Sequence, residues 1–362
     1  MTALSLHELH HGLGARFTEV NGCEVVEDYG DPMAEYTALR DTAGAFDLSF
    51  RGRICLTGAD RMRFLNGQVT NNVKDLRAGE GCYAALVTAK GKLQSDLNIF
   101  SLPNELLLDF EPGLAAAVAE RLEKFVIADD VQVVDATAYY GLLSVQGPKA
   151  EAVVRALALS ADVPVKPLSF STAKDETLGE IYLMNQPRLG TKGFDLFVPM
   201  ASLGAVLDKL IAAARQAGGH ACGWRALETA RIEAGIPRFG ADMDETNLAP
   251  EAGIEGRAIS YSKGCYIGQE VIARIRTYGQ VAKELRGLRL ADDLKSLPVK
   301  GDKLFNGDKE VGYITSATAS PALKANVALG YVRREANEIG TGLTLRNAEG
   351  DGAVKIVALP FK

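Results

Sequence analysis

The sequence KGCYIGQE at positions 263–270 places a thiol, a lysine and two glycines directly before a stretch, 271–275, of helical character. Glycines let the backbone turn tightly or approach a ligand. A helix N-terminus and a nearby ammonium group both favour a thiolate over a thiol. We therefore predict that Cys265 is a reactive or ligating cysteine with Lys263 beside it. The same pattern also fits a small buried cysteine in a tight loop next to a solvated lysine.

A second candidate set lies on two apolar runs, 82–88 and 92–100, which flank Ala89-Lys90-Gly91 and predict a hairpin. Asp96 interrupts the apolar pattern of the second run. A carboxylate there can accept two hydrogen bonds from an amino-pyrimidine edge, or interact with a nitrogen that becomes positively charged. Tyr83 offers an aromatic face for a heterocycle. Because side chains alternate along a strand, Asp96 also fits a solvent-facing position.

Three charged residues, Arg225, Glu228 and Arg231, follow one another at a spacing that lines them along one helix face. Arginine binds carboxylates through two parallel hydrogen bonds, so this row fits a clamp for an acidic ligand. It equally fits a surface ladder of weak ion pairs. Arg274 and Arg276 allow the same two interpretations.

The sequence HELHH at positions 7–11 matches the zincin pattern HExxH, in which two histidines one helical turn apart bind zinc. It lies at the extreme N-terminus, ahead of two glycines, and the remaining histidine is His220. We interpret the segment as a surface helix and predict no metal site.

The elements that position these residues mix strands and helices. Strands are predicted near 53–56, 105–110, 140–145, 180–184 and 194–198, with helices near 59–65, 114–126, 149–159, 201–217 and 224–233. Strands neighbour one another as often as they neighbour helices, which favours α+β layers over a doubly wound parallel sheet. After Gly279, short β-like runs alternate with turn residues and predict a small all-β barrel or sandwich.

Bulk properties restrict the class of protein. The 362 residues carry a formal charge of −6, which does not suit direct DNA binding, since that favours a basic face. The five cysteines are widely spaced and form no CxxC pair, which fits a reducing compartment. We find no secretory signal and no apolar run near the ~20 residues of a membrane span. These features predict a cytoplasmic protein with no membrane association.

Short motifs in a fixed order resemble the glycine-cleavage T-protein (aminomethyltransferase) superfamily over the whole chain. These motifs are LGARF at 13–17, AFDLS at 45–49, FLNGQVTNNV at 64–73, VQGPKA at 145–150, RIEAGIP at 231–237, PEAG at 250–253, SPALK at 320–324 and ALGYV at 328–332. Within the superfamily, 64–73 and 263–270 resemble the YgfZ branch more than the aminomethyltransferase itself.

The resemblance implies a ring of three domains around a central channel: two folate-binding α+β lobes in 1–278, with an internal boundary near 140, and a β-barrel in 279–362. It implies tetrahydrofolate, or a one-carbon derivative, as the cofactor. We expect Tyr83, Asp96 and Asp195 to hold the pterin, and Arg231 to meet the glutamyl tail. Lys263 is a further cofactor-binding candidate, and Cys265 and Asp96 are the catalytic candidates.

Three functions remain open. The YgfZ resemblance implies a role in maturing or repairing iron–sulfur proteins, with effects on tRNA modification and with assembly or client proteins as partners. An aminomethyl- or methyltransferase is the alternative, because Asp96 occupies the second position of a T-protein Asp-Asp pair. Ser95 replaces the first acid of that pair, and Asp195 stands where T proteins usually carry a pterin-facing glutamate. The third candidate is a folate-sensing scaffold without turnover.

Overall fold

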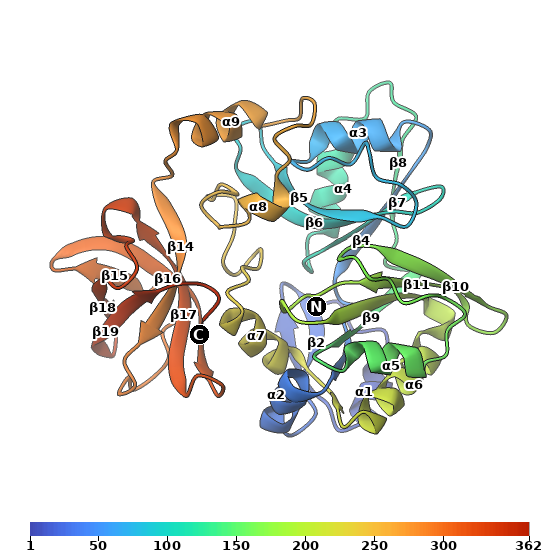
Figure 1. Cartoon of the computed structure of the whole chain (residues 1–362), viewed down its shortest axis with the longest axis horizontal. Helices are drawn as coiled ribbons and strands as arrows, with labels where there is room; N and C mark the ends of the chain where they lie inside the picture. The colour runs from blue at the N-terminus through green and yellow to red at the C-terminus, as the bar shows by residue number, and fades with distance from the viewer. Residues whose placement is uncertain (362) are drawn as a thin grey trace. The chain divides into compact units, whose positions relative to one another are not determined.

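The computed structural model describes residues 1–361 and divides into two compact units. The first unit comprises residues 1–84 and 95–228, and the second comprises residues 85–94 and 229–362. The division cuts through one hairpin and one helix, so that the tip of the hairpin belongs to the second unit. Figure 1 shows mixed α+β elements followed by a C-terminal barrel, which confirms the predicted fold class.

One sheet has five strands in the order β5-β6-β7-β4-β8. Its strands are β4 (Gly52–Thr57), β5 (Gly81–Val87), β6 (Leu93–Ser101), β7 (Leu106–Phe110) and β8 (Gln132–Asp135). β4 lies between β7 and β8 and pairs antiparallel with both. The associated helices are α3 (Arg61–Gln68) and α4 (Ala115–Glu123). The predicted hairpin around Ala89-Lys90-Gly91 is therefore β5-β6.

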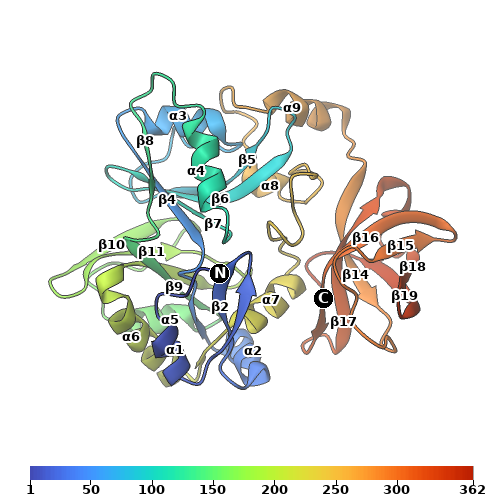
Figure 2. The same cartoon turned by 180° about the vertical axis from the view of Figure 1, so that it is seen from behind.

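The other sheet of the first unit has six strands in the order β10-β11-β12-β9-β3-β13. Its strands are β3 (Gly44–Asp47), β9 (Tyr140–Gln146), β10 (Phe170–Asp175), β11 (Gly179–Asn185), β12 (Gly193–Pro199) and β13 (His220–Ala221). Helices α5 (Ala150–Ala156) and α6 (Leu203–Gln216) cover one face of this sheet, as Figure 2 shows. The short 3₁₀ turn η1 (Met200–Ser202) leads into α6.

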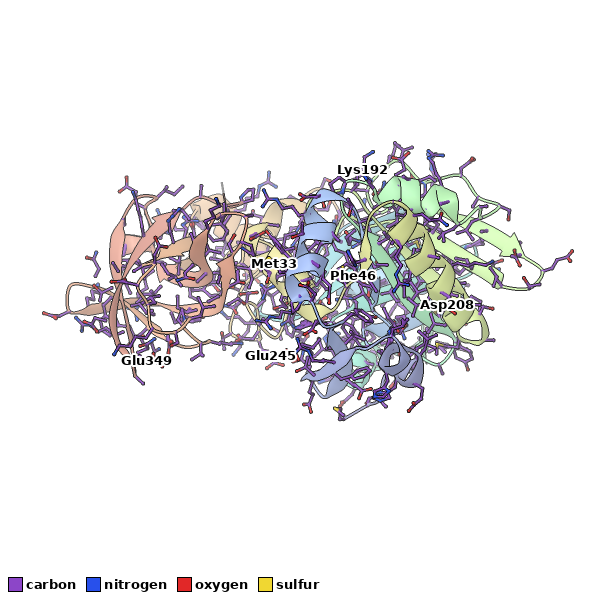
Figure 3. The ribbon with its side chains drawn as sticks, turned by 90° about the horizontal axis from the view of Figure 1, so that it is seen from below. Met33, Phe46, Lys192, Asp208, Glu245 and Glu349 are labelled. Carbon is purple, nitrogen blue, oxygen red and sulfur yellow. The ribbon has the colours of Figure 1, made fainter. Side chains whose placement is uncertain are left out.

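The periodicity of α6 explains its packing. Leu203, Val206, Leu207 and Leu210 are buried in the core of the six-stranded sheet, as expected for apolar residues three and four positions apart. Asp208 lies on the opposite, exposed side, where Figure 3 labels it.

The N-terminal part of the first unit adds α1 (His7–Gly12), α2 (Pro32–Asp41) and a hairpin of β1 (Arg16–Val20) and β2 (Cys23–Asp28). Asp31 caps α2 by accepting a hydrogen bond from the backbone N–H of Ala34, and Pro32 begins the helix. His10, in α1, is fully buried and its Nε2 lies 2.9 Å from Asp47 Oδ2. Residues 1–361 contain no group of three potential ligands that could hold a metal ion.

The second unit ends in a closed six-stranded barrel with the order β14-β17-β16-β15-β18-β19. Its strands are β14 (Lys283–Leu290), β15 (Lys303–Asn306), β16 (Lys309–Ser320), β17 (Ala325–Arg333), β18 (Gly342–Asn347) and β19 (Gly350–Val357), with a 3₁₀ turn η2 (Arg334–Ala336). Closure leaves no open sheet edge, and the interior is filled by aliphatic side chains. This confirms the predicted barrel.

Three helices precede the barrel: α7 (Trp224–Glu233), which crosses the division between the units, α8 (Glu255–Ala258) and α9 (Gln269–Tyr278). Within the described residues, none of these or the other helices combines the length and apolar character needed to cross a membrane. The predicted boundaries near 140 and 278, and the ring with its channel, stay predictions.

Candidate functional site

The β5-β6 hairpin brings Tyr83 and Asp96 together. The Oη of Tyr83 donates a hydrogen bond of 2.8 Å to Asp96 Oδ2. Tyr83 is buried and Asp96 half-buried, so the carboxylate is neither in the core nor on an open solvent face. A hydroxyl donor favours the charged form of a carboxylate and fixes its orientation. The pair therefore presents an oriented acid beside an aromatic ring.

Neighbouring residues hold this hairpin in place. Asn71 Nδ2 donates to the backbone oxygen of Tyr83 at 2.8 Å, which ties β5 to the segment after α3. Ser95 is completely buried, and its Oγ donates to the backbone oxygen of Asp96 at 3.1 Å. The serine that replaces the first acid of the T-protein pair thus points into the protein, and Asp96 alone supplies the carboxylate here.

Asp195 belongs to a different arrangement, a buried charge network. Arg188 donates to both carboxylate oxygens of Asp195, with Nε 3.0 Å from Oδ2. The same guanidinium reaches Asp109 Oδ2 at 2.9 Å. Arg51 Nε donates to Asp109 Oδ1 at 2.6 Å, and a further nitrogen of Arg51 pairs with Glu111. We call Arg51, Asp109, Glu111, Arg188 and Asp195 the buried charge network.

This network fixes the ionisation of Asp109. Burial alone would raise the pKa of Asp109, but the charges of Arg188 and Arg51 outweigh it and hold that pKa well below its usual range. Asp195 is 0% exposed and already accepts three hydrogen bonds from Arg188. A carboxylate with this internal partner contributes to folding, and its role as a pterin ligand stays a prediction.

Sequence reasoning did not find this network, although one signal was present. Arg51 and Arg53, and Asp109 and Glu111, are spaced two apart around or within otherwise apolar strands. Such spacing puts both members of each pair on one strand face. β4 and β7 pair with Arg53 opposite Asp109, which places the two charged pairs on neighbouring strands.

Arg231, in the second unit, is also enclosed. It is 4% exposed and forms an ion pair with Asp242, while its Nη2 donates to Ser316 Oγ at 2.8 Å. Thr315 Oγ1 donates to the same Asp242 carboxylate at 2.6 Å. Arg231 therefore joins the segment after α7 to barrel strand β16. The interpretation of Arg231 as a member of a surface ladder of ion pairs is therefore wrong. The contact of Arg231 with a glutamyl tail stays a prediction.

The loop that carries Cys265 precedes α9, as predicted, and the thiol is exposed. The alternative of a buried cysteine beside a solvated lysine is therefore wrong, since Lys263 is the buried member, with Nζ 4.9 Å from the ring centroid of Tyr266. Burial raises the pKa of Tyr266 to about 12. The reactivity of Cys265 and ligand binding by Lys263 stay predictions.

A glycine fixes the end of this loop. Gly268 has φ +83° and caps α9, and a β-carbon there would lie 2.5 Å from the carbonyl oxygen of Thr88 at the hairpin tip. Only glycine fits such an approach without strain. On α9 itself, Arg274 pairs with Glu270 at 2.7 Å, and the guanidinium of Arg276 lies 4.0 Å from the ring centroid of Tyr261.

Comparison with known proteins gives the family. The GCVT N-terminal domain family matches residues 6–263, and the glycine cleavage T-protein C-terminal barrel domain matches residues 283–362. The chain belongs to the glycine-cleavage T-protein family. The superfamily expected from the sequence motifs is thereby confirmed. So is the cofactor class, because tetrahydrofolate is the cofactor of this family.

Individual relatives agree over nearly full length. The chain is 30% identical to the aminomethyltransferase of Bacillus subtilis over 361 residues, covering 98% of each protein. It is 30% identical to that of Saccharopolyspora erythraea over 360 residues, covering 98% of this chain and 96% of the relative. The crystal structure of glycine cleavage system aminomethyltransferase T from Bartonella henselae superposes with a TM-score of 0.89 at 23% identity, covering 100% and 98% of the two chains. That structure confirms the fold.

The residues of the β5-β6 hairpin fit a pterin. A pterin presents an amino-pyrimidine edge, and a carboxylate is the acceptor that matches two adjacent N–H donors. Asp96, oriented by Tyr83, supplies such an acceptor. Tyr83 and Asp96 are therefore the two predicted cofactor residues that the structure joins in one contact, whereas Asp195, Arg231 and Lys263 each have other partners.

Proposed function

We propose that this protein transfers a one-carbon unit from an amine donor to tetrahydrofolate, with Asp96 as the acid at the reacting nitrogen. The observation that carries the proposal is the hydrogen bond of 2.8 Å from Tyr83 Oη to Asp96 Oδ2. It is supported by relatives that are aminomethyltransferases and that align along 98% of the chain. This is the enzymatic alternative from the sequence, and it has more support than the iron–sulfur role.

In this proposal the chain's own residues supply binding, orientation and charge. Bound tetrahydrofolate supplies the nitrogen atoms that accept the one-carbon unit. The carboxylate of Asp96 stabilises positive charge that develops on the reacting nitrogen, an effect that is strongest where little water is present. Tyr83 is a positioning residue, because it acts on the reacting atoms only by holding Asp96. A half-buried carboxylate with a fixed donor needs little reorganisation during the reaction.

A turnover assay with tetrahydrofolate and aminomethyl or methylated-amine donors tests the proposal. We expect Asp96→Asn to lower kcat by ~100-fold, because electrostatic and acid–base groups typically contribute factors of that order. Asp208→Asn is the matched control, since Asp208 is an exposed carboxylate on α6 (Figure 3), and its kcat should match wild type. Full activity in Asp96→Asn would rule out the role given to this acid.

Tyr83→Phe separates positioning from structure. The variant keeps the ring and removes the hydroxyl that donates to Asp96. We expect a lower kcat, by ~3–10-fold, with little change in KM, because the carboxylate loses the donor that holds its orientation toward the reacting nitrogen. An unchanged kcat would mean that the hydroxyl does not position Asp96.

The exposed thiol of Cys265 supports a second candidate function. It lies in the KGCYIGQE segment that resembles the YgfZ branch, directly before α9. In this proposal the protein binds folate and acts through Cys265 in the maturation or repair of iron–sulfur proteins, and thereby in tRNA modification. Folate binding without turnover of any donor would favour it.

Complementation tests this second function. In a strain that lacks the protein, we expect Cys265→Ala to leave iron–sulfur enzyme activity unrestored. The control is Cys23→Ala, which removes a partly exposed thiol from β2 and should restore activity as wild type does. Full restoration by Cys265→Ala would contradict a role for this thiol.

A further inference from the structure

Two neighbouring strands of the five-stranded sheet, β4 and β8, and the residue before β7 line a pocket of about 420 Å³ in the first unit. Cys55 on β4 is paired with Val134 on β8. Alternate residues share a strand face, so Thr57 lies on the same face as Cys55. The register of β4 with β7 then places Glu105, the residue before β7, next to Thr57. A thiol, a hydroxyl and a carboxylate therefore line one wall of the pocket.

Residues from the six-stranded sheet complete the lining. Tyr140 begins β9 and is paired with Pro199 at the end of β12, and both line the pocket. Tyr139 lies beside them and is 63% exposed. Pockets that hold small molecules typically measure ~300–1,000 Å³, so this volume suits a compact ligand. The lining contains neither Tyr83 nor Asp96 and is separate from the site proposed above.

The lining of the pocket contains an acidic residue but no basic one. Glu105 supplies the carboxylate, and the lining contains no lysine, arginine or histidine. Within residues 1–361, Glu105 also forms no ion pair. Glu180, which lies near Tyr140, differs because it is paired with Lys174 at 3.2 Å. The pocket therefore holds one carboxylate that no protein cation neutralises.

The remaining polar groups of the lining are neutral. Burial raises the pKa of the Cys55 thiol, and the neighbouring Glu105 carboxylate raises it further. Burial likewise raises the pKa of Tyr140, and the charge of Glu105 acts in the same direction. The pocket thus combines a net negative charge with two tyrosine rings, and ring faces attract cations.

We propose that this pocket binds a small organic cation, a primary or N-methylated ammonium group on a short apolar chain. Glu105 neutralises the ammonium group, and the rings of Tyr139 and Tyr140 contact it. Val134 and Pro199 cover the apolar part of the ligand. This site is independent of the transfer reaction proposed for Asp96, because none of its residues takes part in that proposal.

Isothermal titration calorimetry on the full chain tests the site with choline and its uncharged carbon isostere, 3,3-dimethylbutan-1-ol. We expect saturable binding of one choline, with the isostere at least ~10-fold weaker because it lacks the charge. Glu105→Gln should weaken choline by at least ~10-fold for the same reason. The control Glu176→Gln removes an exposed carboxylate in the turn between β10 and β11, and it should leave the affinity unchanged.

A second pair of variants tests the aromatic contact. Tyr140→Phe keeps a ring and should bind choline as wild type does, whereas Tyr140→Leu should bind it more weakly. Absence of saturable choline binding to the wild type would overturn the proposal. Equal affinities for choline and its isostere would overturn it too, as would an unchanged affinity in a folded Glu105→Gln. If Glu105→Gln does not fold, the affinities of the wild type for choline and for its isostere decide whether the proposal holds.

Discussion

At the scale of single residues, the buried charge network has the largest expected effect on stability. Asp195 is 0% exposed, and Asp195→Ala would remove the carboxylate to which buried Arg188 donates three hydrogen bonds, leaving Asp109 as its remaining carboxylate partner. Removing one partner of a buried pair typically costs about 3–5 kcal/mol, so we expect a loss of about 3 kcal/mol in the free energy of unfolding. Urea-induced unfolding measures this change.

The matched control is an ion pair on the surface. Glu151 pairs with Lys192 at 2.9 Å, and both side chains are substantially exposed. Exposed pairs contribute little because water screens them. Glu151→Ala should therefore leave the unfolding midpoint where it is in wild type. Equal destabilisation by the two variants would contradict the structural importance of the network.

The pKa of Asp109 gives a second prediction at this scale. It is held below its usual range in the folded protein, because Arg188 and Arg51 outweigh the effect of burial. Above about pH 5 the group is charged in both states, and its full stabilisation is present. Below that pH the unfolded chain takes up a proton first, and this stabilisation is lost as the pH falls.

Comparing the pH dependence of stability in wild type and in Asp109→Asn separates the contribution of Asp109 from those of the other carboxylates. We expect the variant to be less stable at pH 7 but to lose less stability between pH 5 and pH 3, because it has no proton to take up at this position. Chemical unfolding at several pH values measures both slopes. Parallel curves for the two proteins would contradict the lowered pKa.

At the scale of elements, the start of α9 depends on one glycine. Gly268 has φ +83°, and a β-carbon there would lie 2.5 Å from the carbonyl oxygen of Thr88. Gly268→Ala should therefore lower the free energy of unfolding by about 1–3 kcal/mol. Gly264→Ala is the control from the same loop, since a β-carbon at Gly264 meets nothing within 4 Å. If denaturant unfolding gave both variants the wild-type free energy of unfolding, the close approach of Gly268 to Thr88 would be contradicted.

Elements with a strong local pattern could be predicted from the sequence. Helix α7 (Trp224–Glu233) was predicted with the bounds that the structure gives, and α6 (Leu203–Gln216) within two residues. Both have apolar residues at helical spacing, a signal that depends on nearby residues alone. The hairpin tip at Ala89-Lys90-Gly91 has a turn signature of the same local kind.

Other elements were missed although their signals were present. Helix α2 (Pro32–Asp41) begins with Asp31-Pro32, a cap followed by a proline that favours the first helical position. Its interior is mixed in polarity, so apolar periodicity did not reveal it. The buried charge network could not be predicted, because Asp109 and Arg188 are far apart in sequence and meet only after both sheets have formed.

At the scale of the whole molecule, each unit has a hydrophobic core of its own. Ligand binding changes the free energy of unfolding of the folded chain. A ligand that binds only the native state raises the free energy of unfolding, by about 2.7 kcal/mol at 100 times its Kd. We expect tetrahydrofolate to raise the thermal midpoint of wild type by a few degrees under these conditions. Asp96→Ala should show a smaller increase, and the Asp208→Ala control the full increase.

The Arg231→Met variant distinguishes a role of Arg231 in folding from a role in ligand binding, again through the effect of tetrahydrofolate on the thermal midpoint. The ion pair of Arg231 with buried Asp242 leads us to expect a lower midpoint without ligand, because the substitution leaves that carboxylate without its cation. The increase caused by tetrahydrofolate should remain that of wild type. If Arg231 instead binds the glutamyl tail, the increase itself would shrink, since a weaker Kd gives a smaller logarithmic gain at the same concentration. Thermal unfolding with and without ligand therefore assigns Arg231 to the fold or to the cofactor.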